Sequence, residues 1–333
     1  MKKILRICLF LSAFLFVFLI ISSILALSRV ERSVNPSKPL SDRSQIVFHF
    51  AALVPARNKD LFFIRAYNGM KETADREKAA LQVFEYQPGK DSTSIKALLE
   101  LILNTNPDGL IISIPGNAVY EEVLSRIKEK NIPVVNLEHS AVSGGRDAYI
   151  GTNEFELGRL AGSTAEDLLP SGGEVGILMP ESPGRNSAQN TGYIRGFRQA
   201  VRERPDIQIR LVRSYPDTTI AGEEFIREIL SDYPEIDVAV FTNPVEALGG
   251  AQALIEYGRV GTPLLITADD SPEIRKLMEM GVVSASIVRH PENAGSLAVE
   301  TLVSLARNER ANAYIDSGAS VLLPEDLKRM RHP

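Results

Sequence analysis

The 333-residue chain has 44% hydrophobic and 24% charged residues, a composition typical of a globular protein with one or two domains. Its formal net charge is −5 and it has no basic stripe, which argues against a nucleic-acid-binding protein. A single cysteine, Cys8, excludes an internal disulfide.

The first 28 residues differ from the rest of the chain. Three basic residues among the first six precede an uncharged, apolar run at 7–27. A run of this length can cross the roughly 30 Å hydrocarbon layer of a membrane as one helix, and the basic flank predicts export of the remaining chain. We expect a signal anchor that forms one transmembrane helix. The alternative is a signal peptide cleaved after Ser28, although its apolar core would be unusually long.

Residues 29–44 form a polar linker with two prolines, and strand and helix patterns alternate from residue 46 onwards. The predicted strands are 46–54, 81–86, the end of 106–116, 132–139, 148–153, 172–180, 207–216, 236–243, 262–270 and 282–290. The predicted helices are 60–80, 91–105, 117–131, 154–169, 187–204, 219–233, 244–258, 271–281 and 291–309. Two short strand candidates, 313–317 and 320–324, follow near the C-terminus.

Alternation of strands with helices of about 12–18 residues predicts parallel sheets built from βαβ units. There are too many units for one regular sheet, so we expect an α/β fold with two doubly wound lobes. A single barrel is the alternative, but the paired short strands near the C-terminus do not fit it. In open parallel sheets, ligands bind beyond the carboxyl ends of the strands, and polar residues follow most of the predicted strands here.

Several segments occur in an order that carries a family likeness, among them "YIGTNEFELGRLAG" (149–162), "GYIRGFRQAV" (192–201) and "VVSASIVRHPENAGSLAVETL" (282–302). Over about residues 45–323 the sequence resembles the type I periplasmic sugar-binding proteins of the ribose-binding type. These share their fold with the effector domains of lac-repressor-type regulators.

The resemblance implies the periplasmic-binding-protein-like I fold, in which three crossovers join two α/β lobes and the ligand lies in the cleft between them. The lobes would close on binding. The N-terminal lobe would comprise 45–152 plus 290–316, and the C-terminal lobe 153–289 plus 317–333.

The family pattern also implies a set of ligand-binding side chains, which we carry over position by position. They are Asp60, Phe62, Phe63, Glu138, His139, Asn153, Glu154, Tyr193, Asn243, Asp269 and Arg289. For the two phenylalanines the alternative is a core position at the start of a helix. For Glu154 the alternative is an ordinary acid in the first turn of a helix. At Asn243 the match is uncertain by one residue, because Pro244 can take its place.

The sequence departs from the family pattern at three of these positions. His139 and Tyr193 stand where the family has arginine, and Arg289 stands where it often has glutamine. Ribose specificity is therefore not implied. The guanidinium of Arg289 either contacts the ligand or pairs with Asp269 as a structural bridge.

The function expected from this resemblance is capture of a monosaccharide or similar small polyol by an exported, membrane-tethered binding protein, which serves an ABC-type permease. The alternative is a sugar-sensing partner of a membrane histidine kinase. An enzyme acting on a sugar is a remote alternative, because no phosphate-binding loop, nucleophile elbow or HExxH motif is present. We expect no cofactor and no metal. A DNA-binding regulator is disfavoured, because the apolar segment occupies the place of its N-terminal helix-turn-helix.

Overall fold

The computed structural model describes residues 46–56, 61–88, 92–114, 118–138, 146–180, 186–215 and 218–331. The predicted anchor or signal peptide at 1–28 and the linker at 29–44 lie outside these ranges. Within them, no helix has the length and apolar character needed to cross a membrane. The chain from Val47 onwards forms one compact unit, which contains two α/β lobes.

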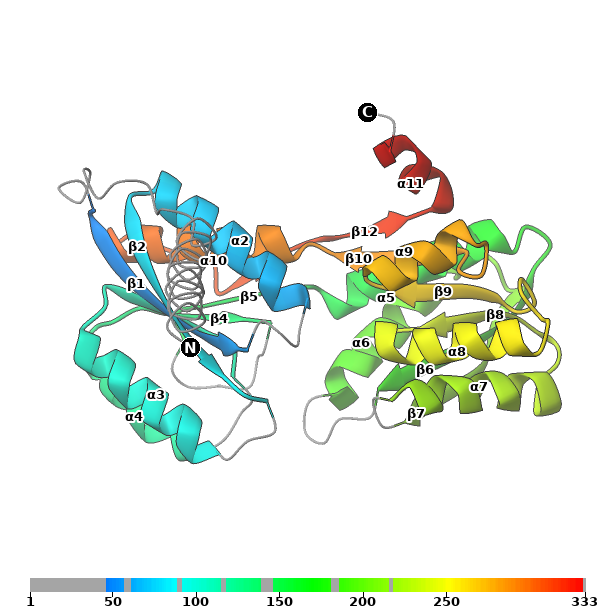
Figure 1. The fold of residues 1–333 in the computed structure, drawn as a ribbon, viewed down its shortest axis with the longest axis horizontal. Helices are drawn as coiled ribbons and strands as arrows, with labels where there is room; N and C mark the ends of the chain where they lie inside the picture. The colour runs from blue at the N-terminus through cyan, green and yellow to red at the C-terminus, as the bar shows by residue number, and fades with distance from the viewer. Residues whose placement is uncertain are drawn as a thin grey trace, which may run out of the picture. The chain divides into compact units, whose positions relative to one another are not determined.

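The first lobe is built on a six-stranded sheet in the order β11-β5-β4-β3-β1-β2, in which every neighbouring pair is parallel. Its strands are β1 (Phe48–Pro55), β2 (Ala79–Tyr86), β3 (Gly109–Ile112), β4 (Val134–Leu137), β5 (Ala148–Gly151) and β11 (Tyr314–Asp316). Helices α2 (Leu61–Arg76) and α10 (Pro291–Ala306) cover one face, and α3 (Ser92–Thr105) and α4 (Ala118–Glu129) cover the other (Figure 1). Alternate residues of β1 therefore enter two separate cores, with Phe50 in one and Leu53 in the other.

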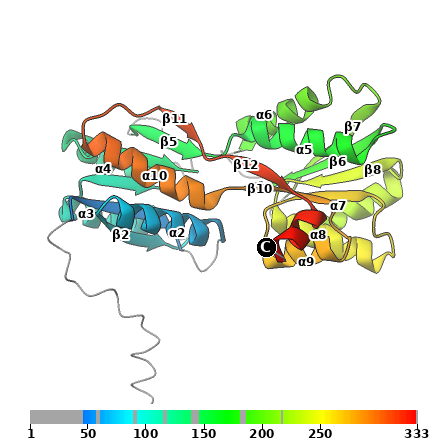
Figure 2. The same ribbon diagram turned by 90° about the horizontal axis from the view of Figure 1, so that it is seen from above.

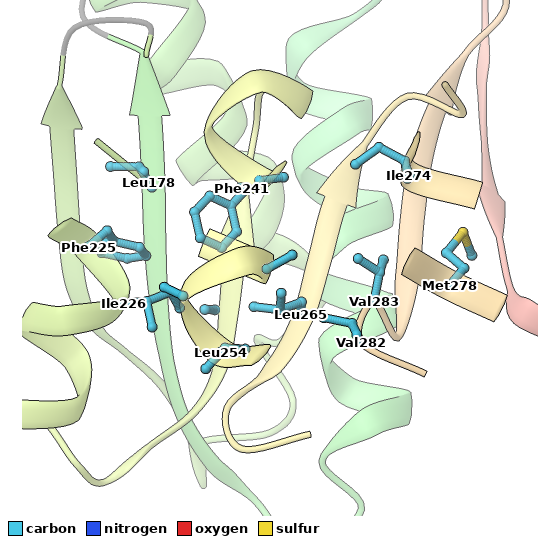
Figure 3. Close-up of a cluster of buried hydrophobic side chains, with 14 of the residues drawn as sticks. Leu178, Phe225, Ile226, Phe241, Leu254, Leu265, Ile274, Met278, Val282 and Val283 are labelled. Atoms are coloured by element: carbon cyan, nitrogen blue, oxygen red, sulfur yellow. The ribbon is translucent and has the colours of Figure 1, made fainter. Parts of the chain in front are cut away.

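The second lobe is also built on a six-stranded sheet, in the order β12-β10-β9-β8-β6-β7. Its strands are β6 (Gly173–Pro180), β7 (Ile207–Tyr215), β8 (Ile236–Phe241), β9 (Leu264–Ala268), β10 (Ala285–Arg289) and β12 (Ala319–Leu322). The first two helices are α5 (Glu154–Leu168) and α6 (Asn186–Ala200). The others are α7 (Thr219–Asp232), α8 (Pro244–Glu256), α9 (Pro272–Glu279) and α11 (Pro324–Arg331). One of its two cores is shown in Figure 3, where the rings of Phe225 and Phe241 meet edge to face at 5.7 Å.

The chain passes between the two sheets after β5, after β10 and between β11 and β12 (Figure 2). The predicted parallel sheets are confirmed apart from one edge strand, because β12 is antiparallel to β10. Only Ser317 and Gly318 separate β11 from β12, and Ala319 pairs with Arg289 at the carboxyl end of β10. The chain therefore enters the second sheet at the carboxyl ends of its strands and runs back along β10. The predicted two-lobe α/β fold is confirmed, while the predicted residue boundaries of the lobes stay predictions.

Candidate ligand-binding site

Two predicted carboxylates occupy corresponding places in the two lobes. Glu138 directly follows β4 and Asp269 directly follows β9, and these strands have the same position in their sheets. Both residues adopt left-handed backbone, with φ of 59° and 64°. The Glu138 N–H donates to Ile150 O at 2.7 Å, and the Asp269 N–H donates to Ile287 O at 3.1 Å. A left-handed conformation costs a non-glycine residue about 1–2 kcal/mol. The hydrogen bonds at the strand ends therefore stabilise a backbone conformation that is unfavourable for either residue by itself.

Arg289, at the end of β10, connects the second of these carboxylates to the first lobe. Its Nη2 donates to Asp269 Oδ2 at 3.0 Å, and its guanidinium carbon lies 5.2 Å from the ring centroid of Phe62 on α2. The negative charge of Asp269 raises the pKa of Arg289 above its ordinary value, and Glu138 and Glu154 add to the effect. The structure thus contains the bridge to Asp269 that the sequence offered as one alternative. It also places the cation over an aromatic face.

Phe62 and Phe63 lie in the first turn of α2 and contribute to the core between this helix, α10 and the sheet. Their side chains are 8% and 3% exposed, and their rings meet edge to face at 5.3 Å. Both are therefore core residues, and Phe62 in addition faces Arg289. Contact of either ring with a ligand stays a prediction.

The carboxylate of Glu138 is fixed by the first passage between the lobes. Its Oε1 accepts hydrogen bonds from the N–H and the Oγ1 of Thr152 at 3.1 and 3.2 Å. Thr152 Oγ1 lies 3.1 Å from Ser317 Oγ, which belongs to the third passage. Thr152 and Ser317 are buried and were not among the predicted site residues. The available signal was a hydroxyl residue near the end of a predicted strand, which is common and carries little weight.

The two predicted asparagines cap helices. Asn153 Oδ1 accepts from the N–H of Phe155 at 3.0 Å and of Glu156 at 3.4 Å, at the start of α5. Asn243 Oδ1 accepts from the N–H of Val245 at 2.8 Å, at the start of α8. Because the Oδ1 atoms serve as caps, the Nδ2 amino group is the part of each side chain that would donate to a ligand.

Glu154 and Tyr193 lie together where α5 and α6 pack. Glu154 is the first residue of α5, where a negative charge interacts favourably with the helix N-terminus. Tyr193 on α6 is 5% exposed and belongs to the core under these helices. Burial raises the pKa of Tyr193, and the charge of Glu154 raises it further, so the phenol stays neutral at physiological pH.

The remaining predicted residues, Asp60 and His139, lie outside the described residues. Of the others, Asp269 and Phe62 contact the guanidinium of Arg289, and the charges of Glu138 and Glu154 act on it. Among the residues that the structure describes, no cluster of three or more His, Cys, Asp or Glu side chains could hold a metal ion. The arrangement offers hydrogen-bonding charges beside an aromatic ring, which suits a small ligand that is polar at its rim and apolar on one face.

Comparison with known proteins places this fold in a family. Residues 50–310 match the model described as "Periplasmic binding protein domain". The D-allose-binding periplasmic protein of Escherichia coli is 24% identical over 258 residues, which cover 74% of this chain and 81% of that protein. The ribose import binding protein RbsB of Escherichia coli is 26% identical over 272 residues, which cover 79% and 86%. Both relatives are named as binding proteins and not as enzymes.

A solved structure supports the same fold. The sugar-binding protein of a Bacillus halodurans sugar ABC transporter superposes with a TM-score of 0.76 at 18% identity, covering 84% of this chain and 99% of its own. The family match implies an extracytoplasmic location. The chain thus belongs to the periplasmic binding proteins, and its resemblance to the type I sugar-binding members of that family is confirmed.

Proposed function

We propose that this protein captures a monosaccharide or similar small polyol between its two lobes, through the side chains that surround Arg289. The observation that carries the proposal is the position of Arg289, which meets Asp269 of its own lobe and the Phe62 ring of the other. A sugar presents hydroxyl groups at its rim and C–H groups on its face. Charged hydrogen-bonding groups next to an aromatic ring are complementary to both features.

The guanidinium of Arg289 has donors left for a ligand. Within the part of the chain that the structure describes, Asp269 is its one hydrogen-bond partner, and a guanidinium carries five N–H groups. Asp269 and Glu138, which come from the two lobes, would accept from sugar hydroxyls and align the ring between them. Asp60 and His139 extend the proposed site, as the resemblance implies.

The names of the relatives, which mention ribose and allose, do not identify the ligand of this protein. The side chains at His139, Tyr193 and Arg289 differ from the ribose-binding pattern, and all three positions belong to the proposed site. Thermal unfolding of the full-length protein with pentoses, hexoses, polyols, inositols and nucleosides tests the proposal. A ligand at 100 times its Kd should add about 2.7 kcal/mol to the free energy of unfolding. The absence of a shift with every member of the panel would contradict it.

We propose that the captured sugar is delivered to an ABC-type permease. In the binding protein, residues 45–152 plus 290–316 would form one lobe and residues 153–289 plus 317–333 the other. The apolar segment at 7–27 would keep the protein at the outer face of the cytoplasmic membrane. A retained anchor also favours the second candidate, a sensing role beside a membrane histidine kinase, because a tethered protein cannot carry its ligand far. N-terminal sequencing of the exported protein separates anchor from signal peptide, since cleavage after Ser28 leaves Arg29 as the first residue.

A further inference from the structure

An ion pair outside the proposed ligand site joins the two lobes. Arg65 on α2 donates from Nη1 to Asp270 Oδ1 at 2.5 Å, although the two residues are 205 positions apart. Arg65 belongs to the first lobe, and Asp270 lies between β9 and α9 of the second. The side chain of Asp270 is only 11% exposed, and that of Arg65 is 36% exposed. This inter-lobe ion pair (Arg65–Asp270) is therefore partly shielded from solvent.

Each member of the inter-lobe ion pair is fixed by a second partner in its own lobe. Arg65 Nε donates to Glu292 Oε1 on α10 at 2.5 Å. Asp270 Oδ2 accepts from Arg275 on α9, whose Nε also donates to the Asp270 carbonyl at 3.0 Å. A carboxylate and a guanidinium that are already oriented lose less side-chain entropy when they meet, so the contact between the lobes is stronger than that of an isolated surface pair.

The inter-lobe ion pair runs beside the contact between Arg289 and Phe62. Phe62 and Arg65 are three residues apart on α2, and this spacing places them on the same side of the helix. Their partners Arg289 and Asp270 are held next to each other through Asp269, which precedes Asp270 and binds Arg289. When Arg65 meets Asp270, Phe62 is therefore brought to Arg289.

Close packing of α2 on α10 makes the arrangement stiff. A Cβ added at Gly69 would lie 2.0 Å from the backbone oxygen of Glu292, and one added at Gly295 would lie 1.9 Å from that of Ala66. Backbone contact this close leaves α2 little freedom to slide along α10. If Arg65 moves, Phe62 and the start of α10 therefore move with it. Helix α10 directly follows Arg289 and His290.

We propose that Arg65 is a positioning residue, whose ion pair with Asp270 holds the lobes in the arrangement where Phe62 and Arg289 face each other, and that it strengthens ligand binding without touching the ligand. This inference rests on the proposed function for its effect on affinity. The apparent Kd of a protein rises in proportion as its binding-competent arrangement becomes less populated. For a partly exposed ion pair with good geometry, loss of Arg65 should weaken binding roughly threefold to tenfold.

The affinity test uses the full-length protein with whichever sugar of the panel stabilises it. Arg65→Gln should raise the Kd, Asp270→Asn should raise it similarly, and Arg65→Lys should restore part of the loss. The matched control is Arg126→Gln, because Arg126 also forms a 2.5 Å ion pair, with Glu100, but within the first lobe. It should leave the Kd unchanged. An unchanged Kd in Arg65→Gln overturns the proposal.

A second measurement needs no ligand and separates failure of this inference from failure of the proposed function. Spin labels at Lys128 and Gln252, both exposed and in different lobes, report the inter-lobe distance in a Cys8→Ser background. A second, longer distance population should appear in Arg65→Gln and be missing in Arg126→Gln. Identical distributions in Arg65→Gln and the unaltered background overturn the proposal even if no sugar is found. If no sugar binds the unaltered protein while Arg65→Gln changes the distances, only the proposed ligand class is wrong.

Discussion

Arg289 and Asp269 form a 3.0 Å ion pair at the carboxyl ends of the adjacent strands β10 and β9. Both side chains are partly exposed, at 30% and 27%, so water screens the pair and its contribution to stability is small. The same partial exposure leaves part of the Arg289 side chain at the surface. The structure therefore contains the bridge to Asp269, and contact of Arg289 with a ligand stays a prediction.

Replacement of Arg289 by alanine should abolish ligand binding and keep the fold. The substitution removes the donors proposed for the sugar rim and the cation over Phe62. Thermal shift with the binding sugar measures the effect. Arg307→Ala is a matched control, since Arg307 also lies over a phenylalanine, Phe48 at 5.9 Å, and near a carboxylate, Glu77 at 3.7 Å. If Arg289→Ala binds as well as this control, the role assigned to Arg289 is wrong.

The left-handed backbone conformation of Asp269 leads to a separate prediction. With φ at 64°, this position accepts asparagine at little cost but resists a β-branched residue. Asp269→Asn and Asp269→Val both remove the charge, and beyond one partly exposed contact with Arg289 they differ in backbone preference. The valine variant should be less stable than the asparagine variant by about 1–2 kcal/mol in urea unfolding. Equal stability of the two variants would mean that the left-handed conformation is not maintained.

Thr152 should stabilise the passage between the lobes through its hydroxyl group. Thr152→Val keeps the shape and the N–H bond to Glu138 but loses the hydroxyl contacts with Glu138 and Ser317. Because these groups are buried, the free energy of unfolding should fall by about 1–3 kcal/mol. Thr152→Ser retains the hydroxyl and should lose clearly less. A serine variant that is destabilised as much as the valine variant would show that the methyl group matters instead.

The order of strands and helices was predictable from the sequence because each buried strand and each amphipathic helix carries its own periodicity. The sequence-based predictions are wrong where no local pattern determines the end of an element or its direction. The helix predicted at 60–80 ends at Arg76, because Lys78 adopts a φ of 57° and Ala79 already begins β2. The direction of β12 was missed because it depends on where the chain enters the second sheet, which no property of residues 319–322 reveals.

The candidate site was predictable only as far as the family pattern extends. It supplied Asp269 and Arg289, whose pairing the structure contains. It gave no indication of Arg65 and Asp270, because charged residues are common on every helix and loop, and their meeting depends on the packing of α2 on α10. Buried positions such as Tyr193 also look polar in a sequence, although the structure places this side chain in a core.

The burial of Tyr193 predicts a loss of stability at alkaline pH. Its folded-state pKa is raised, first by burial and then by the charge of Glu154, so folding favours the neutral phenol. The contribution is fully present below the pKa of tyrosine in the unfolded chain, about 10, and is lost as the pH rises toward the higher folded value. Burial also raises the pKa of Tyr314 to about 12, so this residue adds a loss in the same direction.

Urea unfolding at pH 10 and pH 11 isolates the part that Tyr193 contributes. Tyr193→Phe should lose about 1.0 kcal/mol less than the unaltered protein over this interval, because phenylalanine cannot ionise in the unfolded chain. Any cost of removing the hydroxyl appears equally at both pH values and cancels in the difference. Equal losses in Tyr193→Phe and the unaltered protein would mean that the phenol is solvated and not held in the core between α5 and α6.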